Sequence, residues 1–152
     1  MATNYENKRS YKRKETEADR DLLLNGMKIL LIDDDESLTS VYVTGLAKEG
    51  IEVTVASTGQ DGINKLKAEK FELVVLDQVL PDTSGFEVLK EIKSTDETKN
   101  IPVIILSNFG QKELVKQAID IGAAEYIFKY QVEISDVAKK IKAVLAEEGE
   151  GN

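Results

Sequence analysis

The sequence predicts one α/β domain built on a parallel sheet with helices against both faces. Three apolar runs, at residues 29–32, 73–76 and 103–106, are too short for buried helices and typical of buried strands. Stretches with helical spacing of apolar residues alternate with these runs. Five such strand–helix units in about 120 residues require a sheet that is covered on both sides. We therefore expect a doubly wound, flavodoxin-like, five-stranded parallel sheet of order 2-1-3-4-5, in three α/β/α layers.

Short runs of apolar and β-branched residues place the strands. The expected strands are residues 28–32, 51–56, 73–76, 103–106 and 125–128. The first and the third end directly in acids, at Asp33 and Asp77.

Helices are placed by capping residues and by apolar stripes of helical period. The first is expected over residues 37–50, the second from its cap Thr58 through Lys70, and the third after its cap Ser84. The fourth stops at Gly122, since glycine commonly ends a helix. The expected buried residues are Leu38, Val41, Tyr42 and Leu46 in the first helix, Ile63 and Leu66 in the second, Phe86, Leu89 and Ile92 in the third, Leu114, Val115, Ala118 and Ile119 in the fourth, and Ile134, Val137, Ala138, Ile141, Val144 and Leu145 in the last.

Composition along the chain predicts three segments. Residues 1–26 are mostly polar and carry alternating charges, so they cannot bury enough apolar surface to fold and are expected to form a flexible charged tail. The domain is expected over residues 27–146, and residues 147–152 as a short tail. Too few residues follow Leu145 for an output domain, so we expect the domain to act alone.

Composition also excludes several kinds of chemistry. The chain has neither cysteine nor histidine, which removes thiolate nucleophiles, zinc–thiolate sites and serine–histidine mechanisms. No apolar run exceeds four residues, so neither a membrane span nor a secretion signal is expected, and a cytoplasmic protein fits best. Residues 27–152 carry 14 basic and 23 acidic side chains, a formal charge of −9, which argues against nucleic-acid binding.

Functional groups are expected to gather where the strands end. Asp33, Asp34 and Asp35 follow the first strand, Asp77 the third, Ser107 the fourth and Lys129 the fifth. In doubly wound sheets, the carboxyl ends of the strands border the ligand site. Crowded carboxylates repel one another unless a cation lies between them, and a hard ion such as Mg²⁺, or Mn²⁺, prefers oxygen ligands. Taken singly, an acid here could cap a helix, Ser107 could serve a turn, and Lys129 could be surface charge.

In this order, the motifs resemble the receiver domain of two-component response regulators. The resemblance runs from about Met27 to Leu145 and rests on Leu31-Ile32-Asp33-Asp34-Asp35, on Leu76-Asp77 with Leu80-Pro81 and Gly85, on Leu106-Ser107, and on Tyr126-Ile127-Phe128-Lys129. It implies a signalling module that catalyses only its own aspartyl phosphorylation and dephosphorylation, and so is not an enzyme in the usual sense.

The resemblance also implies a role for each matching residue. Asp77 would be the phosphoryl acceptor. Mg²⁺ would bind to Asp34 directly, to Asp33 mostly through water, to Asp77, and to the backbone carbonyl of Val79. Ser107 and Lys129 would stabilise the phosphoryl group, and Tyr126 would be a switch residue that moves from an exposed to a buried position as Ser107 shifts.

Four positions modify this expectation. Tyr130 stands where the family usually has proline after the lysine, which puts the geometry of the next turn in question, and Asn108 replaces a small residue. Val79 and Phe109 lie where family members vary and where side chains border the phosphoryl group. Two apolar groups there should hinder an attacking water, so we expect phosphate to be lost slowly, over many minutes or longer.

The implied partners are a sensor histidine kinase or a histidine phosphotransfer protein, and downstream a protein target or a second copy, with no nucleic acid and no membrane. The interaction surface would comprise the fourth helix, the fifth strand and the last helix, and would offer Lys112, Glu113, Lys116, Tyr126 and Lys139.

Three alternatives stay open. A phosphorylation-independent pseudo-receiver would keep the fold and signal by binding alone. A haloacid-dehalogenase-like phosphatase could use Asp33 and Asp35, but the chain lacks room for a cap and a clear later acidic motif. A flavodoxin-like cofactor binder would place a phosphate among three aspartates, which would repel it.

Overall fold

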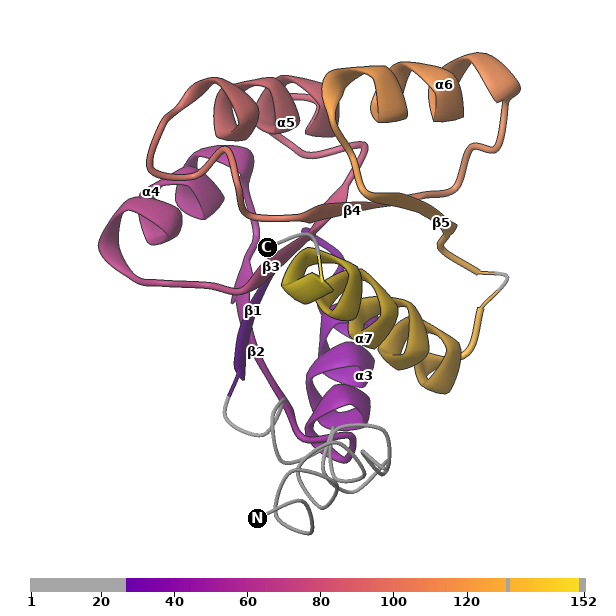
Figure 1. Cartoon of the computed structure of the whole chain (residues 1–152). Helices are drawn as coiled ribbons and strands as arrows, with labels where there is room; N and C mark the ends of the chain where they lie inside the picture. The colour runs from indigo at the N-terminus through magenta and orange to yellow at the C-terminus, as the bar shows by residue number, and fades with distance from the viewer. Residues whose placement is uncertain (1–26, 131, 151–152) are drawn as a thin grey trace, which may run out of the picture.

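Residues 27–130 and 132–150 are described by the structure, a computed structural model (Figure 1). The strands are β1 (Met27–Ile32), β2 (Ile51–Ala56), β3 (Leu73–Asp77), β4 (Val103–Ser107) and β5 (Glu125–Phe128). The helices are α3 (Glu36–Ala47), α4 (Gly59–Ala68), α5 (Gly85–Ser94), α6 (Lys112–Ile121) and α7 (Ile134–Glu150). The tail expected at residues 1–26 lies outside the described residues.

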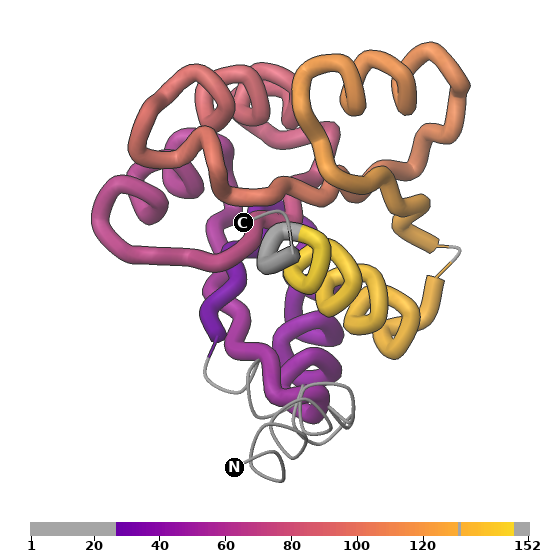
Figure 2. Tube along the Cα trace, viewed as in Figure 1, coloured from indigo at the N-terminus to yellow at the C-terminus, as the bar shows by residue number. Residues whose placement is uncertain are grey.

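The strands form one parallel sheet of order β2-β1-β3-β4-β5, which confirms the predicted topology (Figure 2). Ile32 at the end of β1 pairs with Leu76 in β3, and Asp77 pairs with Leu106 in β4. Ser107 in turn pairs with Phe128 in β5. This register brings the ends of four neighbouring strands to one edge of the sheet, which positions the residues that follow them.

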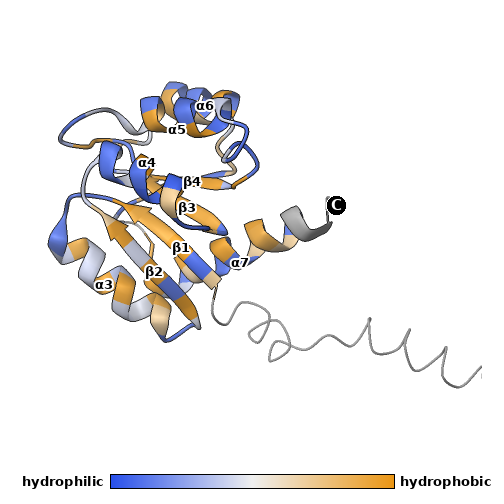
Figure 3. Ribbon diagram, turned by 90° about the vertical axis from the view of Figure 1, so that its left-hand side faces the viewer, coloured by the Kyte–Doolittle hydropathy of each residue, from blue (hydrophilic) through white to orange (hydrophobic). Residues whose placement is uncertain are grey.

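The sheet buries apolar side chains on both faces. Alternate strand residues point to opposite sides, so each strand contributes to two cores. One core lies between the sheet and α4, α5 and α6, and it includes Ile32 and Leu76. The other lies between the sheet and α3 and α7, and it includes Leu31 and Val75. Figure 3 shows the resulting apolar strands between helices whose outer faces are polar.

Two helices start at the capping residues that the sequence predicts, whereas α3 spans Glu36–Ala47 after its cap Asp35 rather than residues 37–50. Thr58 accepts a hydrogen bond from the backbone N–H of Asp61, and Ser84 accepts one from that of Glu87. Gly122, with φ of 124°, ends α6 as predicted. None of the described helices combines the length and apolar character that a membrane span requires.

Some local expectations were wrong. Val41 is 55% exposed and Ile119 is 47% exposed, although both were expected in the core. Each lies at the edge of its helix stripe; in α3 the unexpected buried residue is Thr39, while in α6 the predicted Ala118 is buried. The second helix ends at Ala68 rather than Lys70. Helix α7 runs from Ile134 to Glu150.

Candidate functional site

The ends of β1, β3, β4 and β5 carry the predicted polar residues to one edge of the sheet. Backbone hydrogen bonds fix these residues relative to one another. The N–H of Lys129 donates to the carbonyl of Ser107 at 2.8 Å, and the N–H of Asp33 donates to that of Ala56 at 2.9 Å. Asp33, Asp77, Ser107 and Lys129 are all buried, with 1 to 7% of their surface exposed. The site is therefore built on strand ends rather than on free loops.

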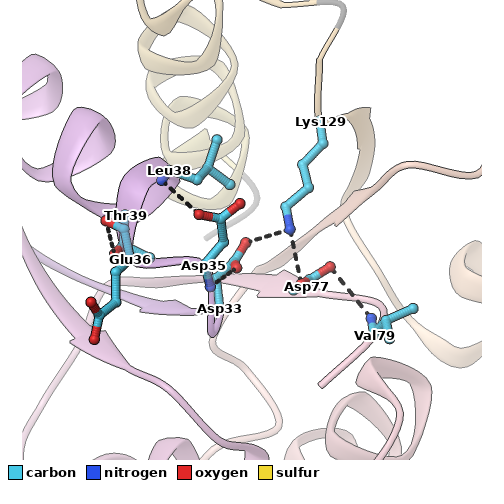
Figure 4. Close-up of polar contacts among 8 residues, drawn as sticks. All are labelled: Asp33, Asp35, Glu36, Leu38, Thr39, Asp77, Val79 and Lys129. Carbon is cyan, nitrogen blue, oxygen red and sulfur yellow. Dashed lines mark hydrogen bonds and ion pairs between the residues drawn. The ribbon is translucent and has the colours of Figure 1, made fainter. Parts of the chain in front are cut away.

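Lys129 lies between two carboxylates that come from different strands (Figure 4). Its Nζ donates to Oδ2 of Asp77 at 3.0 Å and lies 2.9 Å from Oδ2 of Asp33. All three side chains are nearly inaccessible to solvent. A buried ion pair is strong only when its charges balance, because solvent cannot screen the remainder. Here one ammonium faces two buried carboxylates.

The remaining negative charge fits a divalent cation. Asp33, Asp34 and Asp77 each offer a carboxylate oxygen, and these oxygens lie within 4.8 Å of one another. Oδ2 of Asp33 is buried and has no hydrogen-bond partner among the described residues, although it lies near the Lys129 ammonium. Asp33 and Asp77 share this one ammonium, and a further cation would balance the remaining negative charge. An all-oxygen set suits Mg²⁺ or Mn²⁺.

The consecutive residues Asp33, Asp34 and Asp35 have different structural roles. Asp35 caps α3, because its carboxylate accepts from the N–H of Leu38 at 3.1 Å. Asp33 turns inward, and its Oδ1 accepts from the N–H of Asp35 at 2.9 Å. Asp34 is exposed beside them. The helix-capping interpretation is therefore correct for Asp35, while Asp33 and Asp34 face the candidate cation site.

Burial and neighbouring charges shift the pKa values of Asp77 and Lys129. Burial is the main cause that raises the pKa of the Asp77 carboxyl; the Lys129 hydrogen bond opposes it, and the negative charge of Asp33 adds to it. Burial alone would lower the pKa of the Lys129 ammonium, but its contacts with Asp33 and Asp77 outweigh burial and raise it. Lys129 therefore stays charged at neutral pH, whereas Asp77 is an acid whose ionised form is costly without a further cation.

Ser107 and Tyr126 both contact the backbone of Phe109. Oγ of Ser107 accepts from the N–H of Phe109 at 3.0 Å, and the hydroxyl of Tyr126 donates to the Phe109 carbonyl at 2.6 Å. Tyr126 is 9% exposed and packs edge-on against Phe128. The structure thus holds Tyr126 in a buried position. Both side chains therefore bond to the backbone of one residue, Ser107 to its N–H and Tyr126 to its carbonyl.

Exposed side chains lie on the segments that follow the strand ends of the site. Val79 is 58% exposed, Phe109 47% and Tyr130 69%, and Val79 follows Asp77 closely (Figure 4). A pocket of about 310 Å³ opens beside the site, lined by Ser107, Asn108, Gly110, Phe128, Lys129 and Tyr130. No cis peptide occurs in residues 27–130 or 132–150, so the chain passes from Lys129 to Tyr130 through an ordinary trans bond.

Sequence reasoning did not identify two contacts of this site. It assigned Tyr42 to the core only, yet burial, and then the charge of Asp33, raise the pKa of this phenol to about 12. It also assigned no role to the peptide groups of Phe109. Neither has a sequence signal, because no residue pattern indicates which charge or which backbone group a buried side chain will meet.

Comparisons with known proteins agree on one family. The model of the "Response regulator receiver domain" matches residues 29–142. Response regulator RR06 of Streptococcus pneumoniae is 36% identical over 119 residues, which are 78% of this chain and 53% of that protein. Transcriptional regulatory protein AfsQ1 of Streptomyces coelicolor is 34% identical over 118 residues, 77% of this chain and 50% of that protein. The chain spans about half the length of these curated relatives.

Solved structures agree with the fold. A CheY-like receiver domain protein from Methanospirillum hungatei superposes with a TM-score of 0.76 at 29% identity, over 83% of this chain and 98% of that one. Chemotaxis response regulator CheY4 of Vibrio cholerae has a TM-score of 0.72 at 23% identity, over 78% of this chain and 98% of that one, which supports the fold alone.

The raised pKa of Asp77 predicts how stability changes with pH in Mg²⁺-free buffer. The unfolded carboxyl ionises near pH 3.9, about its ordinary value, and the folded one at higher pH. Stability is therefore lost as pH rises through the folded pKa, and ionised Asp77 is a cost at pH 7. We expect Asp77→Asn to raise the free energy of unfolding at pH 7 by about 1 kcal/mol, since it removes one buried negative charge but also weakens the bond to Lys129.

Urea unfolding at several pH values checks this expectation. The advantage of Asp77→Asn should shrink as pH falls toward about 4. Asp96→Asn is a suitable control, because Asp96 is 90% exposed and its ion pair with Lys99 should contribute little. A lower urea midpoint for Asp77→Asn at pH 7 would show that the buried negative charge is already balanced.

Proposed function

The chain belongs to the response regulator receiver domain family, and from this premise we propose that it accepts a phosphoryl group on Asp77 from a phosphohistidine donor in a Mg²⁺-dependent reaction. One observation carries the proposal. The Asp77 carboxylate is buried, is held by Lys129 at 3.0 Å, and has a carboxylate oxygen within 4.8 Å of those of Asp33 and Asp34. A nucleophile, a fixed cation and ligands for a second cation thus meet at one point.

In the proposed transfer, an Asp77 carboxylate oxygen attacks the phosphorus atom of the donor. A new O–P bond forms while the bond from phosphorus to the donor's imidazole nitrogen breaks, and the electron pair of that bond leaves with the imidazole. The Lys129 ammonium stabilises the negative charge on the phosphoryl oxygens. Bound Mg²⁺ would neutralise carboxylate and phosphoryl charge, held by Asp34, by Asp33 largely through water, by Asp77 and by the Val79 carbonyl.

We propose that Ser107 and Tyr126 transmit the effect of phosphorylation from Asp77 to the surface of the domain. The Ser107 hydroxyl accepts from Phe109 and so keeps its own proton free to donate to a phosphoryl oxygen. Because Tyr126 bonds to the carbonyl of the same residue, a shift of Ser107 changes how strongly Tyr126 is held in its buried position. The surface of α6, β5 and α7 would differ accordingly between the two states.

The expected partners follow from this chemistry. A sensor histidine kinase or a histidine phosphotransfer protein would supply the phosphoryl group in the cytoplasm. A protein target or a second copy would read the surface that carries Lys112, Glu113, Lys116, Tyr126 and Lys139. The formal charge of −9 on residues 27–152 favours a protein over a nucleic acid as the direct partner.

Phosphorylation by a small phosphodonor tests the proposal. The full chain incubated with Mg²⁺ and acetyl phosphate or phosphoramidate should gain one phosphoryl group by intact mass, and Asp77→Asn should gain none. Omitting Mg²⁺ or substituting Lys129→Met should lower the rate by at least about 100-fold, the usual scale for losing one stabilising charge. An unlabelled native protein that is folded and binds Mg²⁺ would favour the pseudo-receiver, and repeated turnover of a phosphatase substrate would favour an enzyme.

The apolar side chains beside the acceptor predict a slow loss of phosphate. Val79 and Phe109 are largely exposed next to the site, where they would hinder an in-line water. Phosphorylated native protein should keep its label for many minutes, and Val79→Asn or Phe109→Gln should shorten its half-life by up to about tenfold, equivalent to 1.4 kcal/mol of barrier. Ile119→Asn is the matched control, since Ile119 is equally exposed but lies two turns along α6. Loss of label from the native protein within seconds would contradict this account.

A further inference from the structure

The loop between β3 and α5, residues 78–84, is closed at its base. Val79 and Ser84 form an isolated antiparallel bridge. The N–H of Gly85 donates to the carbonyl of Gln78 at 2.8 Å. A Cβ at Gly85 would collide with the carbonyl oxygen of Asp77, so α5 begins directly against the acceptor residue. The shape of this loop and the position of Asp77 are therefore linked.

The tip of the same loop is anchored on another helix. Oδ1 of Asp82 accepts from the N–H of Gly59 at 2.8 Å, and Oδ2 accepts from that of Gln60 at 3.0 Å. These are free N–H groups in the first turn of α4, where a negative charge is favourable. Thr58 accepts from the next one, that of Asp61, at 3.0 Å. Two separate elements thus share the capping of α4.

Close packing supports the anchor. A Cβ at Gly59 would lie 2.5 Å from Cγ2 of Thr83 and 2.8 Å from Cγ2 of Val88, so only glycine allows the tip to approach so closely. The hydrogen bonds from Gln60 and Gly59 also lower the pKa of Asp82, which keeps its carboxylate ionised. Around the tip, Val79, Pro81 and Asp82 are exposed, and Leu80 is buried. Leu80 and the Asp82 contacts therefore hold this end of the loop.

We infer that Asp82 is a positioning residue for the cation site: it anchors the 78–84 loop on α4 and thereby fixes the Val79 carbonyl beside Asp77. The inference rests on the proposed function, in which that carbonyl binds Mg²⁺. Groups that orient metal ligands contribute to affinity without touching the metal. Asp82 acts in this way through the loop, and it does not contact the phosphoryl group.

Calorimetric titration of the full chain with Mg²⁺ tests the inference. Asp82→Ala should weaken Mg²⁺ binding by about tenfold, the lower end of the range for losing a group that orients metal ligands. Asp82→Asn keeps one accepting oxygen and should fall between Asp82→Ala and the native protein. Thr58→Ala is the matched control, because it removes a cap from the same helix end and leaves the loop anchor in place.

The control separates positioning from helix stability. Both Asp82→Ala and Thr58→Ala should lower the urea midpoint, but Thr58→Ala should leave Mg²⁺ affinity unchanged. Equal affinity losses in the two variants, or native affinity in a folded Asp82→Ala, would overturn the inference and leave the proposed function standing. Absence of Mg²⁺ binding by the native chain would instead overturn the proposed cation site, and the inference with it.

Discussion

The structure depends on an imbalance of buried charge: one ammonium faces more carboxylate than it can neutralise. Lys129 contacts both Asp33 and Asp77, and Asp34 adds a third carboxylate at the rim. In water this excess would matter little, but in a buried site it is costly and demands another cation. Burial, together with the same imbalance, raises the pKa of Asp77, and under the proposed function a bound divalent cation would offset the negative charge of this carboxylate and of an incoming phosphoryl group.

The fold supplies the rigidity that this arrangement needs. Asp33, Asp77, Ser107 and Lys129 follow strands that are buried on both faces, so the backbone leaves these side chains little freedom. Other groups of the site lie on a loop that is held by a few specific contacts, among them the Val79–Ser84 bridge and the two hydrogen bonds to Asp82. The rigid strand ends thus position Asp33, Asp77 and Lys129, and the 78–84 loop positions Val79 beside them.

Much of this could be predicted from the sequence, for identifiable reasons. The strand order and the gathering of Asp33, Asp34, Asp77 and Lys129 follow from short apolar runs and from the rule that parallel strands end together. The exposure of Val41 and Ile119 could not be predicted, because apolar periodicity indicates which face of a helix is buried but not how wide that face is. Nor could the Asp82 contact with α4, which spans 23 residues and has no periodic or motif signal. Local patterns encode elements, whereas such contacts arise only when the elements pack.

The most direct test of the central claim is to locate the cation itself. Crystals of the full chain grown with Mn²⁺, measured by anomalous scattering, would show where a divalent ion binds. We predict an anomalous peak enclosed by the carboxylates of Asp33, Asp34 and Asp77. Well-diffracting crystals with no peak there, or with Mn²⁺ bound only elsewhere, would contradict it.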